Sequence, residues 1–358
     1  MQSFTHVGMP GRVIHGAGSV AALAAEVEAL GAQRVMFCCT KSRVSAVEKL
    51  ATTLSNRFAG ICDAAKIFVP LSAVEPGREM AAALNADCLV SYGGGTAVGL
   101  AKAIALKGGM PIISIVTTYS GSETTALQGI IGHDGVRTNY RDMCMLPQVL
   151  IYDPQLMLDV PLDVSIASGF NSIAHAVSSY LGMDANPVAN MFSENGIRAM
   201  SSAMVRLAQN PRDVDARGDA LHGAWLCGMT LMSSGTTIHH KMVHVLGGGF
   251  ELPHGPTHAI VLPHSTAYNR DAAPDAMRGI ARAFGDENAD APSALFDLLG
   301  KSGAAEGLKQ LGLAESALDE AADRIMIDRY FNLRDYDRTA IRVALQAAWE
   351  GRAPVSAV

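Results

Sequence analysis

Residues 89–102 read Leu-Val-Ser-Tyr-Gly-Gly-Gly-Thr-Ala-Val-Gly-Leu-Ala-Lys, and their pattern indicates the fold of the first part of the chain. A short apolar run leads directly into three glycines, and an apolar helical stretch follows them. Glycine lets the backbone approach a ligand closely, and the first turn of a helix presents free N–H groups to an anion. The stretch therefore predicts a strand, a phosphate-binding turn and a helix. The predicted contacts to the phosphates are Gly93, Gly94, Gly95, Thr96 and the helix-borne charge of Lys102.

A second polar stretch, residues 117–125, follows the next strand candidate. Loops at the carboxyl ends of parallel strands gather at one crevice, so the two stretches would face the same ligand. A simpler interpretation stays open, because a glycine cluster after a strand is often only a tight turn and hydroxyl side chains often cap a helix. The predicted coenzyme contacts in this second stretch are Thr117, Thr118, Tyr119 and Ser122.

The two parts of the chain have different secondary-structure patterns. Before Asp153, short apolar runs alternate with helical stretches, which is typical of a parallel sheet with crossover helices. The strand candidates are 34–39, 87–92 and 111–116. After Pro154 the apolar residues recur at helical spacing, most clearly at 164–181, 187–209, 216–232 and 336–349. The sequence predicts an α/β dinucleotide-binding domain with a parallel sheet over 1–155 and an all-α domain over 156–358.

Composition excludes several classes of protein. The 358 residues are 49% hydrophobic and 17% charged, with a net charge of −6 and no block of Lys or Arg, so we expect no nucleic-acid or anionic-membrane surface. The six cysteines form no C-x-x-C pair, and no signal peptide is apparent, which favours a cytoplasmic protein with reduced thiols. The longest uncharged stretch, from Ala220 up to Lys241, is interrupted by glycines and histidines and is predicted to be a buried helix, not a membrane span.

Six of the eleven histidines lie between His239 and His264. His240 and His244 are four residues apart, which places both on one face of a helix. We expect the glycines at 247–249 to break this helix and fold His254 back towards them. A single histidine on an apolar face is more often a core residue than a ligand, but three that converge favour a functional site. Asn171 and His175 have the same spacing further upstream.

These motifs together resemble the iron-containing alcohol dehydrogenase superfamily and, within it, the maleylacetate reductase family. The resemblance covers nearly the whole chain and implies the two-domain architecture that this superfamily shares with dehydroquinate synthase. The matching motifs are G-G-G-[ST] at 93–96, T-T-x-G-S-E-type at 117–123, Y-D-P at 152–154, G-x-D-x-x-x-H-type at 169–175, and H-x-x-x-H followed by P-H-G at 240–255.

The resemblance also implies a metal site, from which this sequence departs. Metal-dependent members bind iron or zinc through one Asp and three His, at positions that correspond here to Asn171, His175, His240 and His254, with His244 beside the nicotinamide. Asn171 replaces the aspartate, and a neutral amide is a weaker ligand than a carboxylate. Gly99 replaces the acidic residue that these enzymes carry in the glycine loop. We therefore expect no tightly bound metal.

The maleylacetate reductase resemblance implies reduction of the C=C bond of 2-maleylacetate to 3-oxoadipate, with NADH or NADPH, in the breakdown of resorcinol-type aromatics. A double bond conjugated to a ketone already accepts hydride, so protein acids can replace a metal. We expect His240, His244 and His254 to stabilise charge on the ketone oxygen and to supply the proton, oriented by His175 and Asn171.

Further expectations concern the substrate, the coenzyme and the assembly. The dicarboxylate substrate needs cationic groups, for which the candidates are Lys241, His258 and Arg137. The strand that ends at Cys39 is followed by Thr40 and Lys41 and by no acidic residue, so the 2′-phosphate of NADPH would not be repelled and both coenzymes should be usable. The resemblance implies a homodimer, with residues 4–16 as a candidate contact.

Three alternatives remain at this stage. A metal-dependent alcohol or polyol dehydrogenase would contain Fe or Zn, and Asn171 argues against it. A lyase of the dehydroquinate synthase type would need more carboxylates and lysines around the metal. A non-catalytic nucleotide-binding protein would have no need of the histidine cluster.

Overall fold

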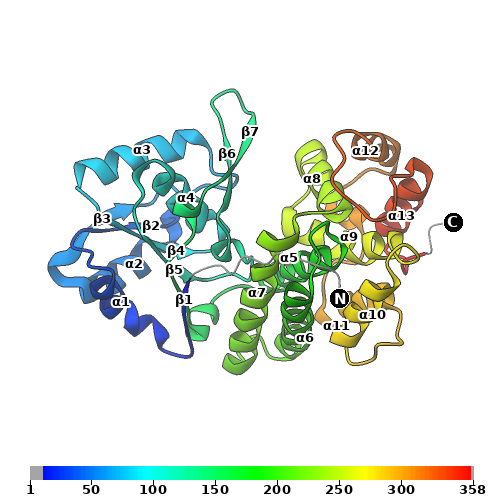
Figure 1. The fold of residues 1–358 in the computed structure, drawn as a ribbon, viewed down its shortest axis with the longest axis horizontal. Coiled ribbons are helices and arrows are strands. Elements are labelled where there is room, and N and C mark those ends of the chain that lie inside the picture. Colours follow the sequence, from blue (N-terminus) through cyan, green and yellow to red (C-terminus); the bar gives the residue numbers. More distant parts are fainter. Residues whose placement is uncertain (1–10, 356–358) are drawn as a thin grey trace. The chain divides into compact units, whose positions relative to one another are not determined.

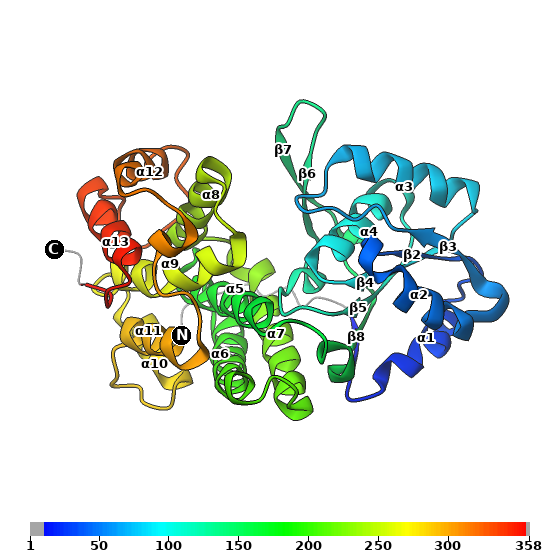
Figure 2. The same cartoon turned by 180° about the vertical axis from the view of Figure 1, so that it is seen from behind.

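The computed structural model describes residues 11–355, which form two compact units, residues 11–160 and residues 161–355 (Figures 1 and 2). The first unit is built on a parallel sheet and the second is helical, so the predicted fold class is confirmed. Residues 4–10, part of the predicted dimer contact, lie outside the described residues.

The first unit contains a six-stranded parallel sheet in the order β1-β8-β5-β4-β2-β3. Its inner strands are buried on both faces, as their continuous apolar sequences predict. In order across the sheet the strands are β1 (Arg12–His15), β8 (Val149–Tyr152), β5 (Ile112–Val116), β4 (Cys88–Gly93), β2 (Val35–Cys38) and β3 (Phe58–Cys62).

Four helices cover this sheet, two on each face (Figure 1). Because side chains of a strand alternate between faces, Val35 and Phe37 pack with one pair of helices while Met36 and Cys38 pack with the other. The first pair is α1 (Leu23–Ala29) and α2 (Val44–Ala51), and the second is α3 (Leu71–Ala83) and α4 (Gly95–Gly108). The structure also places 3-10 helices at Ser19–Ala22, Lys41–Arg43, Thr52–Arg57, Ser122–Thr124, Met143–Met145 and Pro154–Met157.

The strand order places the predicted coenzyme-binding stretches at one edge of the sheet. The chain leaves β2 towards β3 on one side and leaves β4 towards β5 on the other, so the order reverses between β2 and β4. Open parallel sheets bind ligands at this reversal, outside the carboxyl ends of the strands. The segments that follow β2, β4 and β5 all begin at that edge.

A two-stranded antiparallel hairpin, β6 (Leu127–Ile131) and β7 (Arg137–Arg141), projects beyond the sheet (Figure 1). This hairpin has no signal in the sequence, because every residue of β7 is exposed and the strand has no alternation of apolar and polar residues.

In the helical unit, α5 (Leu162–Leu181), α6 (Pro187–Gln209) and α7 (Val214–Ser234) pack side by side. A second core joins α8, α9, α12 and α13. The remaining elements are α8 (Ile238–Phe250), α9 (His254–Tyr268), α10 (Pro274–Ala283), α11 (Ala291–Ser302), α12 (Leu318–Ile325) and α13 (Arg338–Glu350), with 3-10 helices at Leu308–Leu311 and Glu315–Ala317.

Two helix boundaries differ from the sequence predictions. The stretch 220–241 is two helices, because Gly235 adopts a positive φ of 72° and ends α7 before α8 begins. The glycines at 247–249 do not break α8, which continues to Phe250. The turn comes instead at Glu251, with a φ of 56°, and at Pro253. Within residues 11–355, no helix combines the length and the apolar character that a membrane span requires.

Candidate active site

The glycine turn after β4 makes close contact with the segment after β5. Gly93 has a φ of 147°, which favours glycine, and its carbonyl accepts a hydrogen bond from Thr117 N at 3.0 Å. A Cβ on Gly94 would lie 2.4 Å from Thr118 Cγ2, so this position has no room for a side chain. The structure therefore brings together the two polar stretches that the sequence analysis assigned to one ligand.

The same turn has the features of an anion site. Helix α4 begins at Gly95 with no side-chain cap for its first N–H groups, and Thr96 lies in its first turn. The Thr118 hydroxyl, buried beside Gly94, has no hydrogen-bond partner. Tyr119 is fully buried, and Ser122 begins a 3-10 helix. Uncapped amides, a buried hydroxyl and a glycine cradle fit the pyrophosphate of a dinucleotide.

Lys102 lies differently from the sequence prediction. Its side chain is fully buried in α4, and Nζ donates to Ser122 O at 2.5 Å, Thr125 Oγ1 at 2.9 Å and Leu127 O at 3.2 Å. Burial lowers the pKa of Lys102 to about 7, which the nearby Glu123 opposes. These three bonds tie the Ser122–Leu127 segment to α4, so the geometry does not support the predicted contact of Lys102 with phosphates.

Glu123 is not among the site residues predicted from the sequence. This carboxyl group is buried, accepts a hydrogen bond from the Tyr152 hydroxyl at 2.8 Å, and has its pKa raised by burial. Glu123 and Tyr152 both lie within the motifs at 117–123 and 152–154, but the sequence did not indicate that the 3-10 helix Ser122–Thr124 brings Glu123 against β8.

Two further features of this unit bear on the coenzyme and on the metal. Thr40 and Lys41 follow β2 at the same edge of the sheet, with Lys41 exposed and the Thr40 hydroxyl 3.1 Å from the Ser42 hydroxyl.

At Gly99, a Cβ would lie 2.7 Å from Val69 Cγ2 and 2.9 Å from Gln128 Oε1. An acidic side chain therefore has no space at Gly99.

The helical unit gathers the predicted histidines from three helices. His240 of α8 lies between α5 and the other histidines: its Nε2 is 3.2 Å from His175 Nδ1, and its Nδ1 is 3.2 Å from the Ser178 hydroxyl. The rings of His175 and His240 stack with centroids 5.1 Å apart. The ring of His244 is 6.1 Å from that of His240, and its Nδ1 is 3.0 Å from the Tyr330 hydroxyl. Asn171 lies one turn before His175 on α5.

A second line of imidazoles starts at His254, the first residue of α9. His254 Nε2 is 3.2 Å from His258 Nε2, and His258 Nδ1 is 2.8 Å from His239 Nε2. His239 Nδ1 is in turn 2.9 Å from the Ser265 hydroxyl. The four-residue spacing of His254 and His258 could have indicated their contact, but that of His239 with Ser265 depends on how α8 packs against α9.

The inner imidazoles are held neutral by their surroundings. Burial lowers the pKa of His239 to about 3 and that of His240 and His258 well below the ordinary value, and the neighbouring histidines add to the effect. Neutral imidazoles each carry one donor and one acceptor nitrogen, so their hydrogen bonds must alternate in direction.

The remaining substrate candidates belong to different units of the chain. The Lys241 ammonium is 5.8 Å from the centre of the Tyr330 ring, close to His244. Arg137 is on the exposed hairpin of the other unit. His258 is fully buried within the histidine line, so a direct contact with a carboxylate is not supported.

The residues that correspond to a metal site are three histidines and the neutral amide of Asn171. The amide stands where a carboxylate would compensate the charge of a divalent ion, so this donor set does not fit a tightly bound metal. Among residues 11–355, no group of three or more His, Cys, Asp and Glu is arranged to hold a metal ion.

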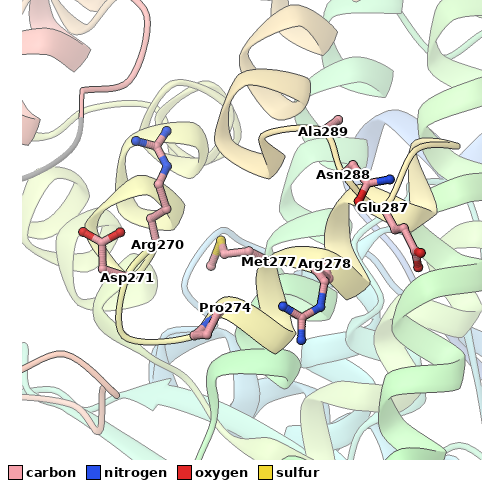
Figure 3. Close-up of a pocket in the computed structure, with 8 residues that line it drawn as sticks. All are labelled: Arg270, Asp271, Pro274, Met277, Arg278, Glu287, Asn288 and Ala289. Carbon is pink, nitrogen blue, oxygen red and sulfur yellow. The ribbon is translucent and has the colours of Figure 1, made fainter.

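A separate surface pocket of about 450 Å³ lies between the end of α9 and the start of α11, and none of the predicted site residues lines it (Figure 3). Its charged groups pair locally, as Arg270 does with Asp290 at 2.8 Å.

Comparison with known proteins identifies the family. The family described as "Iron-containing alcohol dehydrogenase" matches residues 10–154, and "Fe-containing alcohol dehydrogenase family, C-terminal" matches residues 165–349. The chain belongs to the iron-containing alcohol dehydrogenase family. This membership confirms the resemblance found in the sequence.

Relatives within this family include proteins named maleylacetate reductase. One from Burkholderia cepacia is 43% identical over 96% of this chain and 97% of the relative. One from Pseudomonas knackmussii is 40% identical over 98% of this chain and 99% of the relative. The crystal structure of maleylacetate reductase from Agrobacterium tumefaciens is 40% identical, covers 99% of this chain and 100% of the other, and has a TM-score of 0.95.

Proposed function

We propose that this protein is a maleylacetate reductase, which uses NADH or NADPH to reduce the C=C bond of 2-maleylacetate to 3-oxoadipate in the breakdown of resorcinol-type aromatics. The observation that carries the proposal is identity of 37–43% with several maleylacetate reductases over nearly the full length of both chains. We place the enzyme in the cytoplasm and expect a homodimer.

The glycine cradle, the uncapped start of α4 and the Thr118 hydroxyl support a dinucleotide in the first unit. When bound, the nicotinamide coenzyme supplies a hydride. Gly93–Thr96, with Thr117–Tyr119 and Ser122, would hold the pyrophosphate, and Thr40 and Lys41 would leave room for a 2′-phosphate. Lys102 holds the segment that begins at Ser122 against α4.

The histidine cluster supplies the acid and base groups. Hydride addition at the carbon β to the ketone places negative charge on the ketone oxygen, which an N–H donor of the cluster stabilises. A proton then goes to the neighbouring carbon and restores the ketone. His240, His244 and His254 are the proposed donors, and His175 and Asn171 orient them by hydrogen bonds. No step passes through a metal ion, because the donor set does not fit one.

The experiment is a turnover assay of chelator-treated protein with maleylacetate, following the loss of reduced-nicotinamide absorbance with NADH and then with NADPH. We expect turnover with both coenzymes and without added metal. Turnover that appears only after Fe²⁺ or Zn²⁺ is restored would contradict the metal-free mechanism. Failure to turn over maleylacetate under either condition would overturn the proposed function.

A further inference from the structure

The segment that follows β5 packs directly against the glycine turn, and the two form the walls of the proposed pyrophosphate site. Thr117 N donates to Gly93 O at 3.0 Å. A Cβ on Gly95 would lie only 3.4 Å from Ser120 Oγ. Because the two walls are this close, the shape of the site depends on what holds residues 117–125 in position.

Lys102 anchors this segment from within α4. Its side chain is fully buried, and Nζ donates to Ser122 O at 2.5 Å, to Thr125 Oγ1 at 2.9 Å and to Leu127 O at 3.2 Å. A charged amine without water around it is unstable unless an opposite charge lies beside it. Lys102 therefore needs an acidic partner to remain an ammonium ion.

Glu123 is placed to be that partner. It follows Ser122, whose carbonyl Lys102 contacts, and its side chain is 1% exposed. Its Oε1 accepts a hydrogen bond from the Tyr152 hydroxyl at 2.8 Å, whereas its Oε2 is buried and has no hydrogen-bond partner among residues 11–355. Each of the two charges opposes the effect of burial on the other group's pKa. The pair is neutral overall whether the proton lies on the amine or on the carboxyl group, so each group compensates the other.

We propose that Lys102 and Glu123 are positioning residues for the coenzyme: as a charge-balanced buried pair, they hold residues 117–125 against the glycine turn at the spacing that the pyrophosphate requires. The pair acts through the segment that it holds and not by touching the coenzyme. This inference rests on the proposed coenzyme site, but it does not depend on the identity of the substrate.

The direct test is titration of the folded full-length protein with NADH, in the absence of maleylacetate. Lys102→Met and Glu123→Gln each leave one buried group without its charge partner, so we expect each to raise the Kd for NADH by about tenfold or more. The double variant Lys102→Met/Glu123→Gln contains no unpaired charge, and its Kd should be no higher than that of the weaker-binding single variant. Single variants that bind NADH as tightly as the wild type, or effects that multiply in the double variant, would overturn the proposal.

Lys107→Met and Glu79→Gln are the matched controls, because they remove the same charges from exposed positions on α4 and α3. Their Kd for NADH should stay within about twofold of the wild type, since they do not contact the pair.

Thr125→Val keeps the proposal testable if Lys102→Met does not fold, because it removes one acceptor of Lys102 and leaves the charge pair intact. We expect its Kd to rise by about threefold, as the loss of one hydrogen bond typically produces. Thr125→Ser, which keeps the hydroxyl, should restore the wild-type Kd. A wild-type Kd in folded Thr125→Val would contradict the anchoring by Lys102.

Turnover and stability distinguish positioning of the coenzyme from a purely structural contribution. In Glu123→Gln, we expect the KM for NADH to rise while kcat for maleylacetate at saturating NADH stays within about threefold of the wild type. A lower urea midpoint with an unchanged Kd for NADH would show a structural contribution only and would overturn the proposal. If the wild type did not turn over maleylacetate, the proposed function would fail, whereas the NADH titrations would still decide whether the pair positions the coenzyme.

Discussion

His264 is a buried imidazole outside the candidate site, and both of its ring nitrogens are buried without a hydrogen-bond partner. Burial, assisted by the charge of Arg352, lowers its pKa from 6.5 to about 4. The folded protein therefore keeps His264 neutral at a pH where the unfolded chain binds a proton. This group lowers the free energy of unfolding as the pH falls from 6.5 towards 4, and has no such effect above 6.5.

Replacing His264 with Phe should remove that pH dependence. Between about pH 7.5 and about pH 5, we expect the wild type to lose about 2 kcal/mol more of its free energy of unfolding than His264→Phe does. Urea unfolding followed by tryptophan fluorescence is the measurement, because Trp225 and Trp349 both lie in the helical unit. Equal losses in wild type and His264→Phe would show that the prediction is wrong.

At the scale of the element, the strand β4, its glycine turn and α4 form the proposed coenzyme site. A methyl group on Gly94 would displace the Thr118 side chain from the cradle, because the two would be 2.4 Å apart. We expect Gly94→Ala to weaken NADH binding by about fivefold or more, since overpacking a tight site typically costs about 1–3 kcal/mol and a tenfold change in Kd corresponds to about 1.4 kcal/mol. Titration of NADH fluorescence measures the effect.

Gly300→Ala is the matched control for this variant. Gly300 lies in α11, and an added Cβ would meet nothing within 4 Å. NADH affinity should be unchanged in Gly300→Ala. If a folded Gly94→Ala protein also bound NADH as tightly as the wild type, the glycine turn would not be the coenzyme site.

The inner strands of the sheet could be predicted from the sequence, whereas the edge strand and the contacts between elements could not. The runs 34–39, 87–92 and 111–116 became β2, β4 and β5 because inner strands of a parallel sheet are apolar on both faces. The edge strand β3 is mostly part-exposed and has no such signal. In the candidate site, the four-residue spacing of His240 and His244 predicted that the two side chains lie on one face of a helix, and both lie on α8. The bonds from Lys102 to the Ser122–Leu127 segment, and from His239 to Ser265, join elements whose packing the sequence does not specify.

At the scale of the whole molecule, the two proposed functions, coenzyme binding and proton transfer, belong to different units. The glycine turn and the segments beside it belong to residues 11–160, whereas every histidine of the cluster belongs to residues 161–355. Coenzyme affinity and proton transfer should therefore respond to different variants. His240 is the sharpest probe of the second unit, because its two ring nitrogens contact His175 and Ser178 within the cluster.

We expect His240→Ala to lower kcat for maleylacetate by about 100-fold or more, since removing a general acid or its orienting partner commonly costs this much. The Kd for NADH, measured without substrate, should stay within about twofold of wild type, because the pyrophosphate cradle is untouched. Gly94→Ala should show the reverse pattern, with a raised Kd and a kcat at saturating NADH close to normal. Circular dichroism establishes that each variant is folded. If His240→Ala weakened NADH binding as much as it slowed turnover, the two functions would not be separable and His240 would act through the coenzyme site.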